Sequence, residues 1–93
     1  MKAIFISFDQ AHNDDVKRIL DKYLIRGFTF WEGTQGRGTE QGEPHYGSHA
    51  WPSLNNSIMT VVEDDRVNSF IKSLKMLDES SPMLVLRLFV WNV

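Results

Sequence analysis

The sequence predicts a small α+β domain in which two helices cover one face of a four-stranded antiparallel sheet. Three observations lead to this prediction. Each half of the chain has a strand-like run, a helical stripe of apolar residues and a second strand-like run. A glycine-rich segment, Gly33 to Asn55, separates the two halves. The chain has 93 residues, 42% of them hydrophobic, which suits a single domain over residues 1–93 with a modest core.

The first half begins with a β-branched and aromatic run, Lys2 to Phe8, which predicts a strand. The acidic sequence Asn13-Asp14-Asp15 is typical of a helix start, where carboxylates cap free N–H groups and meet the positive end of the helix dipole. A helical stripe follows, made of Val16, Ile19, Leu20, Tyr23 and Leu24. Gly27 ends this helical region, and Phe28 to Glu32 predicts a second strand.

The second half repeats the pattern. Ser57 to Glu63 predicts a strand, and Asp64-Asp65 predicts another acidic helix start. The second helical stripe consists of Val67, Phe70, Ile71, Leu74 and Leu77. Pro82 ends the helical region, and Met83 to Val93 predicts a final strand.

The resulting order, βαββαβ, is that of the ferredoxin-like fold. Right-handed crossovers place both helices on one face of its antiparallel sheet. In the final strand, Leu84, Leu86, Leu88 and Val90 would face the helices. The opposite set, Met83, Val85, Arg87, Phe89 and Trp91, is also mostly apolar. Because a solvated sheet face should be polar, we expect the uncovered faces to pack together in a homo-oligomer. The alternative is that the long loop folds back over this face.

Composition excludes several functional classes. The formal net charge is −2, which gives no electrostatic reason to expect nucleic-acid binding. The absence of cysteine rules out disulfides and thiolate metal sites. No apolar run approaches the ~20 residues that cross a bilayer, and the N-terminal apolar stretch is too short for a signal peptide. We therefore expect a cytoplasmic protein without membrane insertion.

The long loop at about 33–55 holds the candidate functional residues, because loops of this length in small domains are usually functional or disordered. It begins with Gly36-Arg37-Gly38, in which glycines allow backbone N–H groups to approach an anion and arginine adds a charged fork. These residues are candidate ligand contacts. The spacing does not fit the dinucleotide-binding or P-loop patterns, and a flexible or bulged strand end would explain the glycines equally.

A second group, Glu43, His45 and His49, offers a carboxylate and two imidazoles that could hold a divalent metal. Pro44 and Gly47 argue against a helix here, so the four-residue histidine spacing does not by itself create a site. Local hydrogen bonding is the alternative. No catalytic triad or nucleophile elbow can be recognised, so an enzyme is not expected, and a small ferredoxin-like enzyme is kept as a remote alternative.

The layout resembles that of the PII-like superfamily of nitrogen-regulatory signalling proteins, and more distantly the CutA divalent-cation-tolerance family. The resemblance is carried by the strand–helix order, by the stretch GTQGRGTEQGEPHYG after the second strand, and by the Trp51-Pro52 return. It implies a trimer with inward-facing sheets, a small effector in the subunit clefts near Gly36, Arg37 and Gly38, and a loop that contacts a partner such as a transporter or metabolic enzyme. The CutA resemblance implies divalent-metal tolerance or sensing as the alternative function.

One connection departs from this pattern. The resemblance implies a Gly- and Lys-rich phosphate-binding loop between the second helix and the last strand. This chain has Asp78-Glu79-Ser80-Ser81-Pro82 there, with two acids and no Gly, Lys or Arg. An acidic connection repels phosphates, so ATP binding of the usual kind is not expected. The effector is left open among a nucleotide, an anion and a metal.

Overall fold

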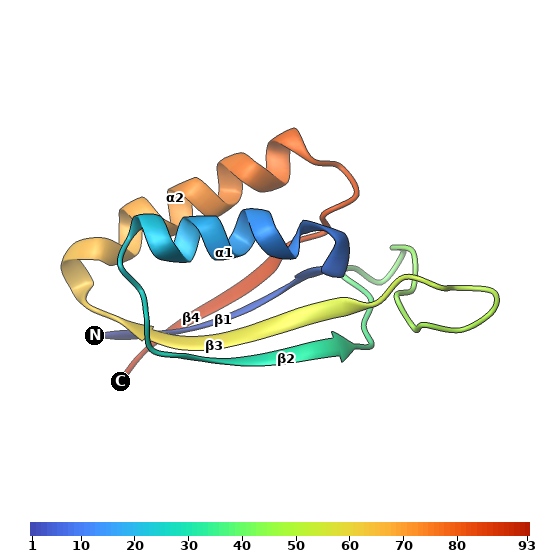
Figure 1. Cartoon of the computed structure of the whole chain (residues 1–93), viewed down its shortest axis with the longest axis horizontal. Helices are drawn as coiled ribbons and strands as arrows, with labels where there is room; N and C mark the ends of the chain where they lie inside the picture. Colours follow the sequence, from blue (N-terminus) through green and yellow to red (C-terminus); the bar gives the residue numbers. More distant parts are fainter.

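The computed structural model describes residues 1–93 and has the predicted ferredoxin-like fold. The elements are β1 (Lys2–Asp9), a short 3-10 helix η1 (Gln10–His12), α1 (Asn13–Lys22), β2 (Phe28–Thr34), β3 (Asn55–Val62), α2 (Asp64–Ser80) and β4 (Arg87–Asn92). The four strands pair antiparallel in the order β2-β3-β1-β4. Both helices lie on one face of this sheet, and the segment between β2 and β3 extends beyond its end (Figure 1).

The core lies between the sheet and the helices. Alternate residues of the two central strands point toward the helices and are fully or almost fully buried. The buried cluster consists of Ile4, Ile6, Phe8, Val16, Leu20, Ile25, Ile58, Val62, Val67, Phe70, Leu74, Leu84 and Leu86. The helical stripes predicted from the sequence supply Val16, Leu20, Val67, Phe70 and Leu74 to this core, so the apolar spacing alone identified which face of each helix is buried.

The first helix is shorter than its apolar stripe suggests. It ends at Lys22, and Leu24 has a left-handed backbone (φ 56°) with a side chain that is 63% exposed. Ile25 is buried instead, and its backbone N–H donates to the Leu20 carbonyl at 2.9 Å. The prediction that Leu24 belongs to the buried stripe was wrong, because the helix ends at Lys22, two residues before it.

The acidic residues at the helix starts do not cap in the predicted way. The N-cap positions are His12 and Glu63, and neither makes a side-chain capping hydrogen bond. Asp14 and Asp15, and likewise Asp64 and Asp65, lie in the first turns, where a carboxylate interacts favourably with the helix dipole.

The last strand starts later than predicted. Residues 83–86 are not in a strand, because Leu84 N–H donates to the Ser81 carbonyl in a turn and Val85 adopts a left-handed backbone (φ 48°). Leu84 and Leu86 are nevertheless buried in the core. The strand itself, Arg87–Asn92, keeps the predicted alternation, because Arg87, Phe89 and Trp91 pair with Ser7, Phe5 and Ala3 on the face away from the helices.

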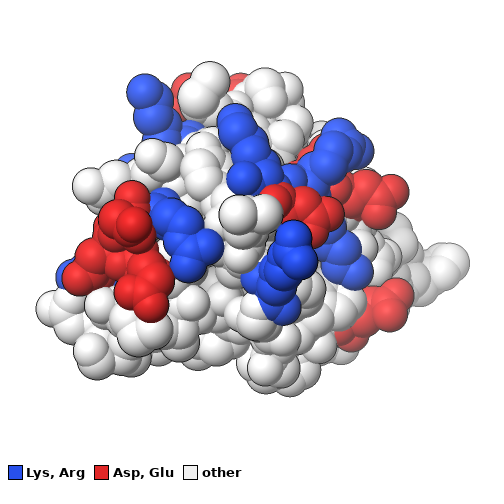
Figure 2. All heavy atoms as spheres, turned by 60° about the vertical axis from the view of Figure 1, so that its left-hand side comes forward, with Lys and Arg blue, Asp and Glu red and all other residues white.

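This second sheet face carries a large apolar surface. It presents side chains from all four strands, namely Phe5, Trp31, Met59, Val61, Phe89 and Trp91. Trp31 is 45% exposed and Phe89 60% exposed, so the long loop does not fold back to cover the face. Charged atoms gather over the helical layer, and the lower edge formed by the sheet is largely free of them (Figure 2). Neither helix is long and apolar enough to cross a membrane.

Candidate functional site in the loop between the central strand pair

The loop is organised by a backbone bridge near its base. Gly36 N–H donates to the His45 carbonyl at 2.9 Å, and His45 N–H donates to the Gly36 carbonyl at 2.7 Å. A side chain at position 36 would force the Asn55 amide to shift, because an added Cβ would lie 2.9 Å from the Asn55 Nδ2 atom. The bridge divides the segment into an inner lobe, residues 37–44, and an outer turn, residues 46–54.

His45 points inward and is only 3% exposed. Its Nδ1 atom lies 2.7 Å from Asn55 Oδ1 and 3.6 Å from Asp9 Oδ2. Because an amide oxygen only accepts hydrogen bonds, Nδ1 carries the proton and donates to Asn55. The other Asp9 oxygen accepts from Ala11 N–H at 2.8 Å, which starts the 3-10 helix. His45 is therefore held by the ends of β1 and β3.

The predicted ligand contacts Gly36, Arg37 and Gly38 are consecutive residues, but their structural roles differ. The Gly38 carbonyl accepts a 2.6 Å hydrogen bond from Arg87 Nε, which joins the loop to β4. A Cβ at position 38 would lie 2.4 Å from Val85 Cγ1, so this glycine is required by close packing. Arg37 is exposed, and the one hydrogen bond of its guanidinium runs to the Glu40 carbonyl at 3.4 Å.

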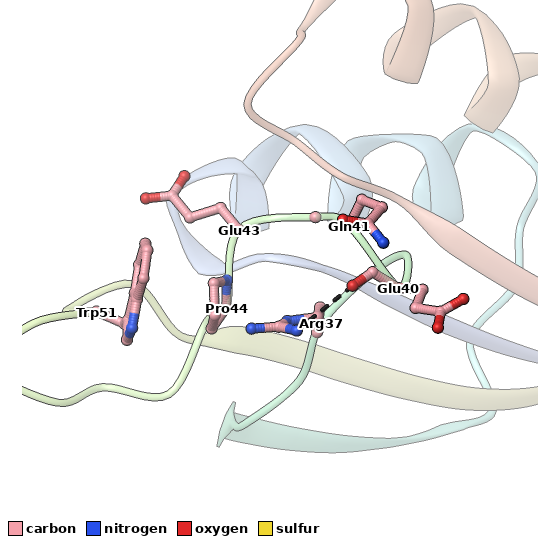
Figure 3. A pocket seen from close by; sticks show the side chains of 7 residues that line it. Arg37, Glu40, Gln41, Glu43, Pro44 and Trp51 are labelled. Atoms are coloured by element: carbon pink, nitrogen blue, oxygen red, sulfur yellow. Dashed lines mark hydrogen bonds between the residues drawn. The ribbon is translucent and has the colours of Figure 1, made fainter.

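The inner lobe and Trp51 of the outer turn line an open surface pocket of about 530 Å³ (Figure 3). Seven residues line it, namely Arg37, Glu40, Gln41, Gly42, Glu43, Pro44 and Trp51. In Figure 3 the Arg37 guanidinium points toward Pro44 and Trp51, the Glu43 side chain extends on the Trp51 side, and the Glu40 carboxylate points away. The lining contains Arg37 and Glu43, one from each predicted group.

The outer turn places Trp51 at the pocket's mouth. Ser48 N–H donates to the Trp51 carbonyl at 2.8 Å, and Trp51 N–H donates to Ser48 Oγ at 3.1 Å. Gly47 has a left-handed backbone (φ 63°) and donates to the Ser53 carbonyl at 3.0 Å. These hydrogen bonds join residues within the outer turn, so the backbone that carries the Trp51 indole is held in a hydrogen-bonded turn.

The predicted metal ligands lie in three different surroundings. His45 is buried beside Asp9 and Asn55, Glu43 lines the pocket, and His49 is exposed in the outer turn. Within one chain, no group of three or more His, Cys, Asp or Glu residues is arranged to hold a metal ion. The predicted set is thus not assembled by a single subunit, and metal binding stays a prediction to be tested.

The connection from α2 to β4 is occupied by the chain's own contacts. Asp78 Oδ1 accepts from Leu86 N–H at 3.1 Å, and the Leu84 carbonyl accepts from Asp9 N–H at 2.8 Å. No Gly, Lys or Arg lies between Asp78 and Leu86. A phosphate would meet a carboxylate here and few free N–H groups, in agreement with the departure noted in the sequence.

Three residues of this region were not singled out by the sequence. Asp9 and Asn55 hold His45, and Arg87 holds Gly38. Asp9 and Asn55 pair directly across β1 and β3, so an exact strand register would have placed them together.

Comparison with known proteins agrees with this architecture. Residues 1–93 match the family described as "Nitrogen regulatory protein P-II". No curated protein sequence matches the chain. The fold is similar to CPII, a nitrogen regulatory PII-like protein from Thiomonas intermedia K12 solved with ADP, AMP and bicarbonate (TM-score 0.76, 17% identity, 99% of this chain and 88% of that chain covered). It is also similar to the apo form of CPII (TM-score 0.69, 16% identity, 99% and 89% covered). A PII-like signaling protein from Thermus thermophilus matches at a TM-score of 0.68 and 20% identity, with 99% and 85% covered.

Proposed function

Because the chain belongs to the nitrogen regulatory protein P-II family, we propose that it is a regulatory protein of the cytoplasm that acts as a homotrimer. In this proposal a small effector binds in the clefts between subunits, near Gly36, Arg37 and Gly38. Binding changes the order of the loop at about 33–55, and the loop then contacts a partner protein, a transporter or a metabolic enzyme. The family is one of regulators and not of enzymes, and no catalytic constellation is proposed.

The observation that supports the proposed homotrimer is the exposed apolar face of the sheet. Phe5 and Trp31 contact each other there as a tilted aromatic pair with ring centroids 6.4 Å apart. Phe89 and Trp91 lie on the same face and are 60% and 44% exposed. A contiguous apolar surface of this kind on a small domain is typical of an interface. Sheet-to-sheet packing of three subunits would bury it and leave the charged helices outward.

The loop base is suited to transmit a binding event. Arg87 links it to β4, and the Gly36–His45 bridge links it to the buried ends of β1 and β3. An effector that binds the Arg87 guanidinium, or that displaces Gly38 from it, would break the hydrogen bond between them and so change which loop conformation is favoured. A ligand shifts such an equilibrium only through different affinities for the two states, and contacts at the base give that difference.

The choice of candidate effectors rests on the ligands of CPII and on the charge of the α2–β4 connection. CPII was solved with ADP, AMP and bicarbonate, which makes these compounds the first candidates for this chain. The acidic α2–β4 connection disfavours a triphosphate, because Asp78 already occupies the N–H of Leu86. We therefore rank a small anion or a nucleotide with few phosphates above ATP.

The test combines mass and stability measurements on the full chain. Size-exclusion chromatography with light scattering should give three times the 10.8 kDa chain mass. Thermal shift with AMP, ADP, ATP and bicarbonate should then show a rise in melting temperature for at least one compound. A ligand at ~100 times its Kd adds about 2.7 kcal/mol of apparent stability. A monomeric mass would contradict the assembly, and no shift with any of the four would contradict the effector assignment.

Divalent-metal binding is the alternative carried over from the sequence. Its test is titration of Zn²⁺, Cu²⁺ and Ni²⁺ into the wild-type protein and into the double variant His45→Ala/His49→Ala. If a metal raises the melting temperature while the nucleotides and bicarbonate do not, and the double variant loses this effect, the metal function replaces the effector function. Equal metal binding in both proteins would remove these histidines as ligands.

A further inference from the structure

We propose that the pocket of the inner lobe binds a small zwitterionic amino acid. Its carboxylate would pair with the Arg37 guanidinium, its ammonium group with the Glu43 carboxylate, and its side chain would lie against Trp51. This inference rests on the proposed function, since it gives the effector-responsive loop a ligand of its own. Arg37 is also a proposed contact of the cleft effector, but all the residues that line this pocket come from one loop of one chain.

The first argument is that opposite charges line the same pocket without meeting. Arg37 and Glu43 both line it, yet none of the salt bridges of the chain involves either residue. The guanidinium makes only one long hydrogen bond, to the Glu40 carbonyl at 3.4 Å, so most of its five N–H donors are free. Figure 3 shows the Arg37 and Glu43 side chains extending toward the Trp51 side at different heights of the pocket. A dipolar ligand between them would satisfy both charges.

The second argument is that the walls are fixed by hydrogen bonds. The Gly36–His45 bridge closes the lobe that carries Arg37 and Glu43, and the Ser48–Trp51 turn holds the backbone of Trp51. Pro44, which contributes to the lining, is buried. Pre-organised walls lower the entropy cost of binding a small molecule.

The third argument is size and chemical selection. A volume of about 530 Å³ lies within the usual range for small-molecule sites and exceeds what an amino acid needs. A carboxylate can bond the guanidinium in a bidentate way, and the Glu43 carboxylate can accept charge-assisted hydrogen bonds from an ammonium group. A simple anion would pair with Arg37 but be repelled by Glu43. A simple cation would pair with Glu43 but be repelled by Arg37. The pocket therefore selects for molecules that carry both charges.

The experiment uses ¹⁵N-labelled full-length protein and follows the indole N–H signals by NMR. The chain has three tryptophans, and Trp51→Phe identifies the signal of the pocket. The probe is L-glutamine, compared with propionate, which lacks the ammonium, and n-propylamine, which lacks the carboxylate. L-glutamine should shift the Trp51 signal saturably, while the signals of Trp31 and Trp91 stay in place. The one-charge compounds should bind at least about tenfold more weakly.

Two variants test the assigned charges. Arg37→Gln and Glu43→Gln should each weaken L-glutamine binding at least about tenfold. Arg18→Gln, on the exposed surface of α1, is the matched control and should bind as the wild type does. Unchanged Trp31 and Trp91 signals show that each variant is folded.

Three results would overturn the inference: no saturable shift of Trp51, equal affinity for propionate and L-glutamine, or wild-type affinity in both charge variants. The titrations contain no nucleotide or bicarbonate, so the two proposals separate. If AMP, ADP or bicarbonate stabilises the protein but L-glutamine leaves Trp51 unshifted, only this inference fails. If L-glutamine binds while those compounds have no effect, the cleft effector fails and the loop pocket stands.

Discussion

The Nδ1 atom of His45 lies 2.7 Å from Asn55 Oδ1, and this buried contact ties the middle of the loop to the first residue of β3. Both side chains are less than a tenth exposed. Removing the amide would leave a buried imidazole N–H without its acceptor, a loss that costs about 1–3 kcal/mol. The contact therefore makes the loop's conformation part of the stability of the domain.

We predict that Asn55→Ala lowers the free energy of unfolding by about 1–3 kcal/mol, measured by urea denaturation. Amide hydrogen exchange at Gly36 and His45 should also accelerate, because the bridge between them loses its support. Asn68→Ala, on the exposed surface of α2, is the control and should leave both properties unchanged. If Asn55→Ala has wild-type stability, the buried contact does not hold the loop.

A second prediction concerns the contact between Gly38 and β4. Gly38→Ala would place a Cβ 2.4 Å from Val85 Cγ1, so the loop base must move away from Arg87 and lose its 2.6 Å hydrogen bond. Overpacking of this kind costs about 1–3 kcal/mol. Gly27→Ala is the matched control, because a Cβ there has no heavy atom within 4 Å.

Thermal unfolding should show a lower melting temperature for Gly38→Ala and little change, or a small rise from the reduced entropy of the unfolded chain, for Gly27→Ala. Equal melting temperatures for the two variants would mean that the loop base adapts without loss. In that case Arg87 would not be a fixed link between the loop and the sheet.

Much of the fold followed from apolar spacing, because the period of each run is set by the face that must be buried. Val16, Leu20, Phe70 and Leu74 were assigned to the core on spacing alone and are buried. The errors lie where local backbone geometry overrides the pattern. Leu24 and Val85 are both apolar, yet each adopts a left-handed conformation, Leu24 just after the end of α1 and Val85 just before the start of β4. Nothing in an apolar side chain signals such a turn.

The loop was recognised as the candidate functional segment from its glycines, but its internal geometry was not. His45 was grouped with Glu43 and His49, whereas the structure buries it beside Asp9 and Asn55. These partners come from strand ends that are distant in sequence, and only the register of β1 against β3 brings them together. Arg87 was assigned to the correct sheet face, but its contact with Gly38 depends on where the loop base runs.

A third prediction concerns the N-terminus and the start of α2. The N-terminal ammonium lies 2.9 Å from Asp64 Oδ1, and its hydrogen bond, then its charge, lower the pKa of this carboxyl from the ordinary value of 3.8. Because the folded-state pKa is below the unfolded one, the stabilisation is fully present above the unfolded pKa. It is lost as the pH falls through the folded-state pKa.

Asp64→Asn should therefore be less stable than the wild type at pH 5 to 7, and the difference should disappear as the pH falls below about 3.8. Urea denaturation at pH 7, 5, 3 and 2 measures it, and high salt should reduce it because both groups are exposed. Asp65→Asn removes a neighbouring carboxylate that forms no ion pair and serves as the control. If wild type and Asp64→Asn differ in stability by the same amount at all four pH values, the ammonium–Asp64 pair is not the cause of the difference.

The last prediction tests the apolar sheet face. Phe89 lies on the edge strand β4, paired with Phe5 of the neighbouring strand β1, and Phe89→Glu would place a carboxylate in the proposed subunit interface. A buried charge without a partner is strongly unfavourable, so the trimer should dissociate or weaken. Met76 on α2 has the same exposed fraction, 60%, and Met76→Glu is the matched control on the helical side.

Light scattering at equal protein concentrations should give the trimer mass for the wild type and Met76→Glu, and a monomer mass for Phe89→Glu. Far-UV circular dichroism should confirm that each variant keeps its secondary structure. A trimeric Phe89→Glu would exclude this face from the interface. A loss of assembly in both variants would instead mean that the charge acts through general destabilisation, and the sheet face would lose its special role.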